Sequence, residues 1–382
     1  MNKITKIYFP KRIKIKPINT KKNKHFVKKK RFIKDILFIN GYNPVKFPHS
    51  YHYRVLHQKE QLELGFLECD EYFYLSFEPI IVRYYRVIII SSCPWTEKIG
   101  EAISLAKNLN KKVLFDIDDL IFINKYRIFT PFISKFSEKQ KEVYVDRVNR
   151  VEKTLKLCQG AITTTETLAK EIKYYIPKVL VNHNVASEKM WRLSQQALSI
   201  KNLKRKDDHI IIGYFCTRIT HNRDLEMIKP ALLKILKEYK NVTLLLFGEF
   251  SFDNIFNEFS SQISMRKIID WEEIPKIISN ININIIPIEN STINLAKSEN
   301  QWIEASLVKV PTIASNYGEF KKIIKQNETG FLCTDLNDWY LTLKTLIKND
   351  HLRKNIGLNA YQICKEDYNT IYTHKNIVNF IN

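Results

Sequence analysis

The sequence lacks the features of secreted, zinc-binding and membrane-spanning proteins. Its six cysteines are scattered along 382 residues, with no CxxC pair and no spacing typical of a zinc site. The longest apolar runs have the length of strands, well short of the roughly 18 residues that a membrane helix needs. No apolar stretch of the kind found in cleaved signal peptides follows the basic N-terminus. These absences favour a globular cytoplasmic protein with reduced thiols.

Acidic residues are missing from the first 34 positions, which carry about fourteen Lys and Arg. The whole chain has a formal net charge of +21, so the remaining residues carry only about +7. We therefore expect residues 1–34 to form a basic N-terminal arm on a mildly basic body. An anionic membrane surface would attract such an arm by about 1 kcal/mol per charge. A solvated tail is the alternative, and nucleic acid is the least favoured partner.

Apolar runs of strand length alternate with helix-like segments along the rest of the chain. This alternation is typical of a parallel sheet covered by helices. One series of such units spans residues 35–184, and a second spans 209–365. The polar stretch 185–208 between them predicts a linker, and 366–382 form a C-terminal segment. The sequence thus predicts an α/β protein with two Rossmann-like, doubly wound parallel-sheet domains, a single long sheet being the alternative.

The run GYFCTRITHNRDLEMI (213–228) joins a strand to a helix through a polar loop. Gly213 is expected to follow the strand, and Arg218, His221 and Arg223 come before or at the helix start. Free N–H groups and the macrodipole make a helix N-terminus favourable for anions. A basic side chain there adds charge-assisted hydrogen bonds to a phosphate. The loop is therefore a candidate phosphate site, while helix capping is the structural alternative.

The run STINLAKSENQWIEASLVKVPTIASNYG (291–318) follows the apolar strand NININIIPI. It contains a loop, a short helix with Lys297, Ser298, Glu299 and Glu304, and another strand. Carboxylates at the carboxyl edge of a parallel sheet can accept hydrogen bonds from ribose hydroxyls. Surface ion pairs are the alternative interpretation of Lys297 and Glu304.

The run FDIDDLIF (115–122) ends a strand in three acids. Such grouped carboxylates are unfavourable unless they meet cations, donors or substrate hydroxyls. We expect Asp118 and Asp119 to bind substrate hydroxyls or act as a base, or else to cap the following turn. A DxD pair after a strand also suggests a magnesium-dependent phosphatase that uses Asp116 and Asp118.

These three segments together resemble GT-B glycosyltransferases, in particular the retaining family 4 (glycosyl transferases group 1) and its D-x-D-D / N-x-x-K-S branch. The resemblance implies that the C-terminal domain binds a nucleotide-diphosphate sugar, with Gly213, Arg218, His221 and Arg223 at the diphosphate. It implies that Glu304 binds the ribose, and that the loop with His52 and Tyr53 after the first strand faces the donor phosphates and the acceptor. The donor-sugar glutamate that the family often carries eight positions earlier is Ala296 here. Lys297 lies next to this gap, where we expect a catalytic lysine that meets a phosphate or a sugar hydroxyl, and Ser298 and Glu299 beyond it are expected to bind the donor.

The resemblance suggests that residues 366–382 cross back to the N-terminal domain, and it also implies a reaction. A sugar would pass with retention of configuration to a glycan or lipid-linked acceptor held by the N-terminal domain, near Asp118 and Asp119. Neither a metal nor a cofactor besides the donor substrate is expected. With the basic arm, the resemblance suggests bacterial surface polysaccharide assembly at the inner membrane face. A non-catalytic membrane or nucleic-acid adaptor with a transferase-like fold remains the alternative.

Overall fold

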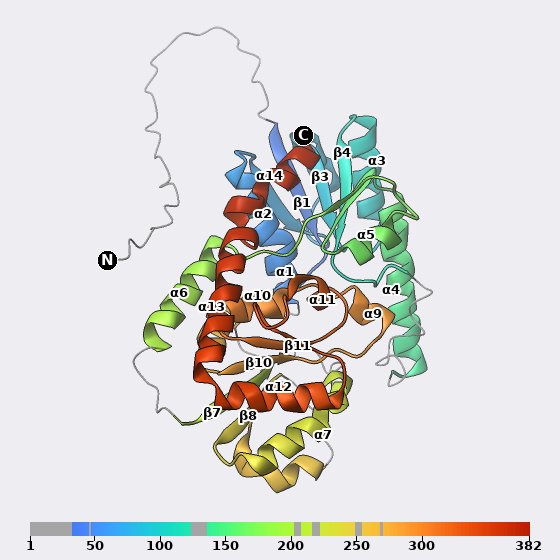
Figure 1. Cartoon of the computed structure of the whole chain (residues 1–382). Helices are drawn as coiled ribbons and strands as arrows, with labels where there is room; N and C mark the ends of the chain where they lie inside the picture. The colour runs from blue at the N-terminus through green and yellow to red at the C-terminus, as the bar shows by residue number, and fades with distance from the viewer. Residues whose placement is uncertain are drawn as a thin grey trace, which may run out of the picture. The chain divides into compact units, whose positions relative to one another are not determined.

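The computed structural model describes residues 33–45, 47–123, 136–201, 208–215, 222–248, 254–267 and 270–382. The predicted basic arm, except for its last two positions, lies outside these residues, and so do Arg218 and His221. The described residues all belong to one compact unit, Ile33–Asn382. Its two six-stranded sheets are both parallel throughout (Figure 1).

The first sheet has the strand order β2-β1-β3-β4-β5-β6. Its strands are β1 (Lys34–Asn40), β2 (Cys69–Phe73), β3 (Tyr85–Ser91), β4 (Lys112–Ile117), β5 (Gly160–Thr163) and β6 (Val179–Val181). Helices cover both faces, so the central strands are apolar without alternation. Leu37 and Ile39 pack on the face covered by α3, whereas Ile36 and Phe38 pack towards α14.

The helical segments around this sheet are α1 (Pro48–Tyr51), the π-helical turn η1 (His52–Leu56), α2 (His57–Leu64), the 3-10 helix η2 (Pro79–Tyr84), α3 (Glu97–Asn108), α4 (Glu138–Lys156) and α5 (Glu166–Ile172). The last three of them begin at side-chain caps. Thr96 and Thr165 accept hydrogen bonds from the first turns of α3 and α5, and Ser137 forms a capping box with Gln140 at α4. These caps fix where the chain leaves each strand.

The second sheet has the strand order β12-β11-β10-β7-β8-β9. Its strands are β7 (Ile210–Phe215), β8 (Val242–Phe247), β9 (Ile263–Arg266), β10 (Ile283–Ile286), β11 (Thr312–Ser315) and β12 (Phe331–Cys333). The accompanying helices are α6 (Glu188–Lys201), α7 (Asn222–Glu238), η6 (Asn254–Gln262), η7 (Trp271–Glu273), α8 (Ile274–Ser279), α9 (Thr292–Leu295), α10 (Asn300–Leu307), α11 (Phe320–Ile323), α12 (Leu336–Lys348), α13 (Asp350–Asp367) and α14 (Thr370–Ile381).

The two parallel sheets with surrounding helices confirm the predicted α/β fold class. The strand order reverses between β1 and β3 in the first sheet, and between β7 and β10 in the second. In doubly wound sheets, ligands bind beyond the carboxyl ends of the strands at such switch points. The fold therefore directs attention to the segments that follow β1, β3, β7 and β10.

Two segments contain helices that the sequence-based description did not name. The predicted linker 185–208 contains the helix α6, because Met190 and Ala197 lie on one helical face and are buried. The segment 366–382 contains α14, which packs against α2 (Figure 1). Ile377 and Ile381 of α14 are buried with residues of β1.

The described cysteines are all free and buried, as expected of thiols that pack as small hydrophobes. Among the described residues, no helix combines the length and apolar character that crossing a membrane requires.

Candidate functional site

Asp224 organises the switch point of the second sheet. It lies in the first turn of α7 and is almost fully buried. One carboxylate oxygen, Oδ1, accepts hydrogen bonds from the Glu289 backbone N–H at 2.8 Å and from Asn294 Nδ2 at 3.1 Å. The other oxygen, Oδ2, lies 3.3 Å from Lys297 Nζ. Asp224 thereby ties the segment after β10 to α7 and holds the Lys297 ammonium group, whose side chain is 27% exposed, at this edge.

The other predicted phosphate-binding residues differ in where they lie in the structure. Arg223 is exposed at the start of α7, next to Asp224. Gly213 lies inside β7 rather than after it, and a Cβ there would come within 2.6 Å of Ile281 Cδ1. Close packing of β7 against Ile281 therefore accounts for this glycine. Arg218 and His221 lie outside the described residues, so their phosphate role stays a prediction.

Ser298 and Glu299 form the turn that opens α10. Glu299 is the N-cap residue of this helix and is fully buried. Its Oε1 accepts a hydrogen bond from His183 Nδ1 at 3.0 Å, while its Oε2 is buried and makes no hydrogen bond to any of the described residues. The hydrogen bond to Glu299 raises the pKa of His183 above its usual 6.5. The arrangement presents a carboxylate–imidazole pair at the carboxyl end of β6.

Glu304 lies within α10 and is only 8% exposed. Its Oε1 accepts a hydrogen bond from the Tyr53 hydroxyl at 3.1 Å and lies 3.7 Å from His49 Nδ1. Burial raises the pKa of Glu304 to about 7, although the bond from Tyr53 opposes this change. A carboxyl group with a pKa of about 7 is partly ionised near neutral pH. In its ionised form it can accept hydrogen bonds from hydroxyl groups.

The segment that supplies Tyr53 also packs against an aromatic side chain of the second half. The His52 ring meets the Trp271 ring edge to face, with centroids 4.2 Å apart. His52 and Tyr53 belong to the π-helical turn η1, a rare element that is frequent at functional sites. The sequence analysis did not name His49 or His183 as site residues, and only their distance from Glu304 and Glu299 in the fold reveals them.

The acids at the end of β4 and directly after it have different environments. Asp118 Oδ1 accepts a hydrogen bond from the Tyr42 hydroxyl at 2.7 Å, and Asp119 Oδ1 accepts one from the Leu120 backbone N–H at 2.9 Å. Asp116 is fully buried, with an ion pair to Arg54 and a hydrogen bond from Gln58. A phosphatase nucleophile must be accessible to its substrate, so the surroundings of Asp116 do not suit the phosphatase interpretation.

The structure thus brings four predicted residues, Lys297, Ser298, Glu299 and Glu304, to the beginning and inner face of one short helix. Asp118 and Asp119 lie at the carboxyl edge of the first sheet. Within the part of the chain that the structure describes, no group of three or more His, Cys, Asp or Glu side chains could hold a metal ion.

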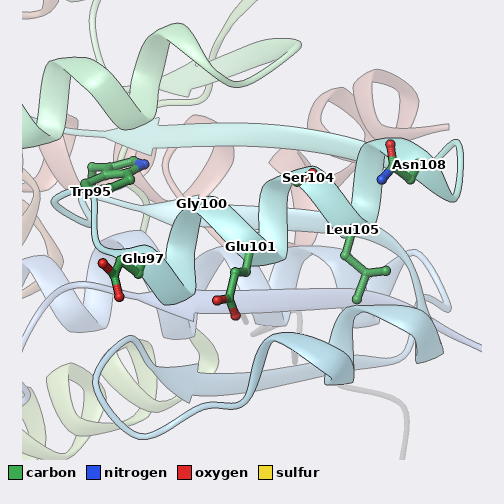
Figure 2. A pocket seen from close by; sticks show the side chains of 7 residues that line it. All are labelled: Trp95, Glu97, Gly100, Glu101, Ser104, Leu105 and Asn108. Atoms are coloured by element: carbon green, nitrogen blue, oxygen red, sulfur yellow. The ribbon is translucent and has the colours of Figure 1, made fainter.

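A separate hollow of about 530 Å³ follows the surface of α3 (Figure 2). Its lining residues are Trp95, Glu97, Gly100, Glu101, Ser104, Leu105 and Asn108. None of them is a predicted site residue. At one end of the hollow the Lys153 ammonium group lies over the Trp95 ring, 3.2 Å from the ring centroid.

Comparison with known protein families gives one match in the second half of the chain. Residues 210–349 match the family model described as glycosyl transferases group 1. This stretch begins at β7 and ends just before α13, so it includes Asp224, Lys297 and Glu304. No curated protein sequence matches the chain.

Solved structures match nearly the whole chain. Sucrose-phosphate synthase from Thermosynechococcus elongatus superposes with a TM-score of 0.61 at 14% identity, over 90% of this chain and 97% of that one. HepE from Anabaena, in complex with UDP and glucose, superposes with a TM-score of 0.60 at 13% identity, over 91% of this chain and 98% of that one. A glycosyltransferase from Rickettsia africae superposes with a TM-score of 0.60 at 14% identity, over 91% of this chain and 97% of that one. At these identities the likeness shows the GT-B fold.

Proposed function

We propose that this protein is a glycosyltransferase that uses a nucleotide-diphosphate sugar as its donor. The observation that carries the proposal is the coincidence of the glycosyl transferases group 1 match, residues 210–349, with the buried Glu304 and the Lys297–Asp224 pair. Glu304 and the Lys297–Asp224 pair lie by the carboxyl edge of a sheet whose switch point is suited to a nucleotide.

The donor would be held by the second half of the chain. The Glu304 carboxylate would accept hydrogen bonds from both ribose hydroxyls, since one carboxylate has acceptor sites for two donors. Lys297 and Arg223 would meet the diphosphate, together with Arg218 and His221, next to the N-terminus of α7. Gly213 lies in the strand that leads to this loop. Ser298 and Glu299 would contact the donor sugar.

The proposed mechanism depends on stabilising the leaving diphosphate. Negative charge develops on that group as the glycosidic bond breaks, and fixed cations in a site that excludes water stabilise such charge strongly. Lys297 and the α7 N-terminus would supply this stabilisation without a metal or a further cofactor. Asp118 and Asp119 would bind the acceptor hydroxyl or take its proton.

The remaining features of the proposal concern the product and its setting. We include transfer with retention of configuration to a glycan or lipid-linked acceptor, in the assembly of a bacterial surface polysaccharide. The basic residues 1–34 would bring the enzyme to the anionic inner face of the membrane as a peripheral protein. Their clustered charge supports this part of the proposal.

Transfer assays with isotopically labelled nucleotide sugars test the proposal. The protein should release the free nucleoside diphosphate from one donor, slowly to water and faster with a suitable acceptor. The Lys297→Ala variant should release it at least tenfold more slowly, because removal of one charge-stabilising donor typically lowers kcat by about 10²–10³. Salt-dependent binding to nucleic acid or anionic vesicles, with no binding of any nucleotide sugar, would instead favour the adaptor.

A further inference from the structure

Asn184 connects the two halves of the molecule through a single side chain. It follows β6, and it is 1% exposed. Its Oδ1 accepts a hydrogen bond from Arg54 Nη1 at 3.1 Å. Its Nδ2 donates to Ser298 Oγ at 3.1 Å and to Asn300 Oδ1 at 2.8 Å. The carboxamide therefore uses its acceptor on one side and both its N–H groups on the other.

The orientation of this carboxamide is set by its partner on the first side. A guanidinium group only donates hydrogen bonds, so the Asn184 oxygen must face Arg54 and its NH₂ group must face α10. Arg54 is itself fixed, because it is fully buried and forms an ion pair with Asp116. Arg54 Nη1 also donates to the Asn182 carbonyl oxygen at 3.0 Å. Asn184 is thus anchored to a rigid, buried group of charges.

The other side of the carboxamide holds the turn that opens α10. This turn comprises Ser298, Glu299 and Asn300, and no side-chain hydrogen bond caps the helix from within its own chain segment. Lys297 directly precedes the turn, and Glu304 lies in the helix that follows it. A change in the position of the turn would therefore move both proposed donor-binding groups together.

We propose that Asn184 is a positioning residue that fixes the start of α10, and with it Lys297 and Glu304, to the Arg54–Asp116 ion pair. The inference rests on the proposed function, because Lys297 and Glu304 are given donor-binding roles there. Asn184 acts on the donor only through α10. Small displacements of positioned groups can lower the rate by up to about a hundredfold, so the effect of losing this anchor is measurable.

The chain offers a matched control two residues earlier. Asn182 is 4% exposed, and its Nδ2 donates to Gln61 Oε1 at 2.9 Å. Both Asn182 and Gln61 belong to the first half, and within the described part of the chain the Asn182 side chain makes no hydrogen bond to α10. Asn182→Ala and Asn184→Ala therefore both remove a buried carboxamide, but only Asn184→Ala removes hydrogen bonds to the turn, which His183 still contacts through Glu299.

The experiment compares these two variants with the full-length wild type. Donor affinity is measured by calorimetry with the nucleotide sugar that the wild type binds, and kcat and KM are measured for its transfer or hydrolysis. Asn184→Ala should lower kcat/KM at least tenfold relative to Asn182→Ala, at similar loss of thermal stability. Equal kinetics in the two variants would overturn the inference.

A second variant approaches the same contact from α10 and avoids disturbing Arg54. Asn300→Ala lies at a half-buried first position of a helix, where alanine is well tolerated. It should reproduce the kinetic defect, and the double variant with Asn184→Ala should be little worse than either single variant. Additive losses would overturn the inference. A folded wild type that binds no nucleotide sugar would overturn the proposed function itself, and the role of Asn184 with it.

Discussion

The buried carboxyl group of Glu304 should make both the stability and the donor affinity of the protein depend on pH. Burial raises its pKa from the usual 4.5 to about 7 in the folded protein. In the unfolded chain the group is hydrated and titrates near 4.5. Between these two pH values the folded state binds a proton that the unfolded state has released, so the free energy of unfolding falls as pH rises.

The magnitude follows from the two pKa values. Each pH unit in the window contributes 1.36 kcal/mol, so the free energy of unfolding should fall by about 3 kcal/mol between pH 4.5 and pH 7. This contribution is fully present below pH 4.5 and is lost above pH 7. Glu304→Gln keeps a neutral group at all pH values and should lack it. Urea denaturation of both proteins at a series of pH values gives the difference directly.

Donor affinity should change in the opposite direction. Ribose hydroxyls donate to the ionised carboxylate, so the protonated form must lose its proton before it binds both of them. With a pKa of about 7, the apparent dissociation constant of a nucleotide sugar should fall about tenfold between pH 6 and pH 8. A nucleotide sugar is the proper ligand because a terminal phosphate titrates near pH 6 by itself.

Two variants control this experiment. Glu304→Gln should bind the nucleotide sugar weakly and with no pH dependence in this range. Glu138→Gln removes a carboxylate of the same type from the exposed surface of α4 and should behave like the wild type. A wild-type affinity that is constant from pH 6 to pH 8, or a pH dependence that persists in Glu304→Gln, would refute the reasoning.

Three further predictions concern the groups around Glu304. Lys297→Ala should weaken binding of the nucleotide sugar about ten- to hundredfold, as expected for one hydrogen bond to a charged group, and calorimetry at constant pH measures it. Asp116→Asn should lower the free energy of unfolding by about 3–5 kcal/mol, because Arg54 keeps an uncompensated buried charge; a urea-denaturation change below 1 kcal/mol would contradict this. The His183 imidazole should titrate above pH 6.5 by NMR, and at a lower pH in Glu299→Gln. The contribution of the His183–Glu299 pair to the free energy of unfolding should be present below pH 6.5 and lost as pH rises through the raised pKa.

The sequence predicts the strands of this protein well because they are buried on both faces. Continuous apolar runs such as those of β1, β3 and β8 can satisfy their surroundings only inside a covered parallel sheet. Short strands are harder to recognise. β2 contains two acids and β12 has three residues, and the sequence analysis named neither segment. The helix α6 was not predicted, because it lies in a stretch whose composition is polar overall.

Residues of the candidate site were partly predictable, but the contacts between them were not. Glu304 and Lys297 stand out in a local motif, so the sequence indicates them. Their partners come from distant parts of the chain: Tyr53 is 251 residues from Glu304, and His183 is 116 residues from Glu299. No local pattern links such residues, because only the folding of both sheets brings them together.

The central claim is that the carboxyl edge of the second sheet binds a nucleotide-diphosphate sugar through Glu304. Thermal unfolding of the purified protein against UDP, GDP, dTDP, CMP and their sugar conjugates tests it most directly, beside Glu304→Ala. A ligand at a hundred times its dissociation constant stabilises the folded state by about 2.7 kcal/mol. The account predicts such stabilisation by one nucleotide and its sugar conjugate, and its loss in the variant. A folded wild type that none of these ligands stabilises would contradict it.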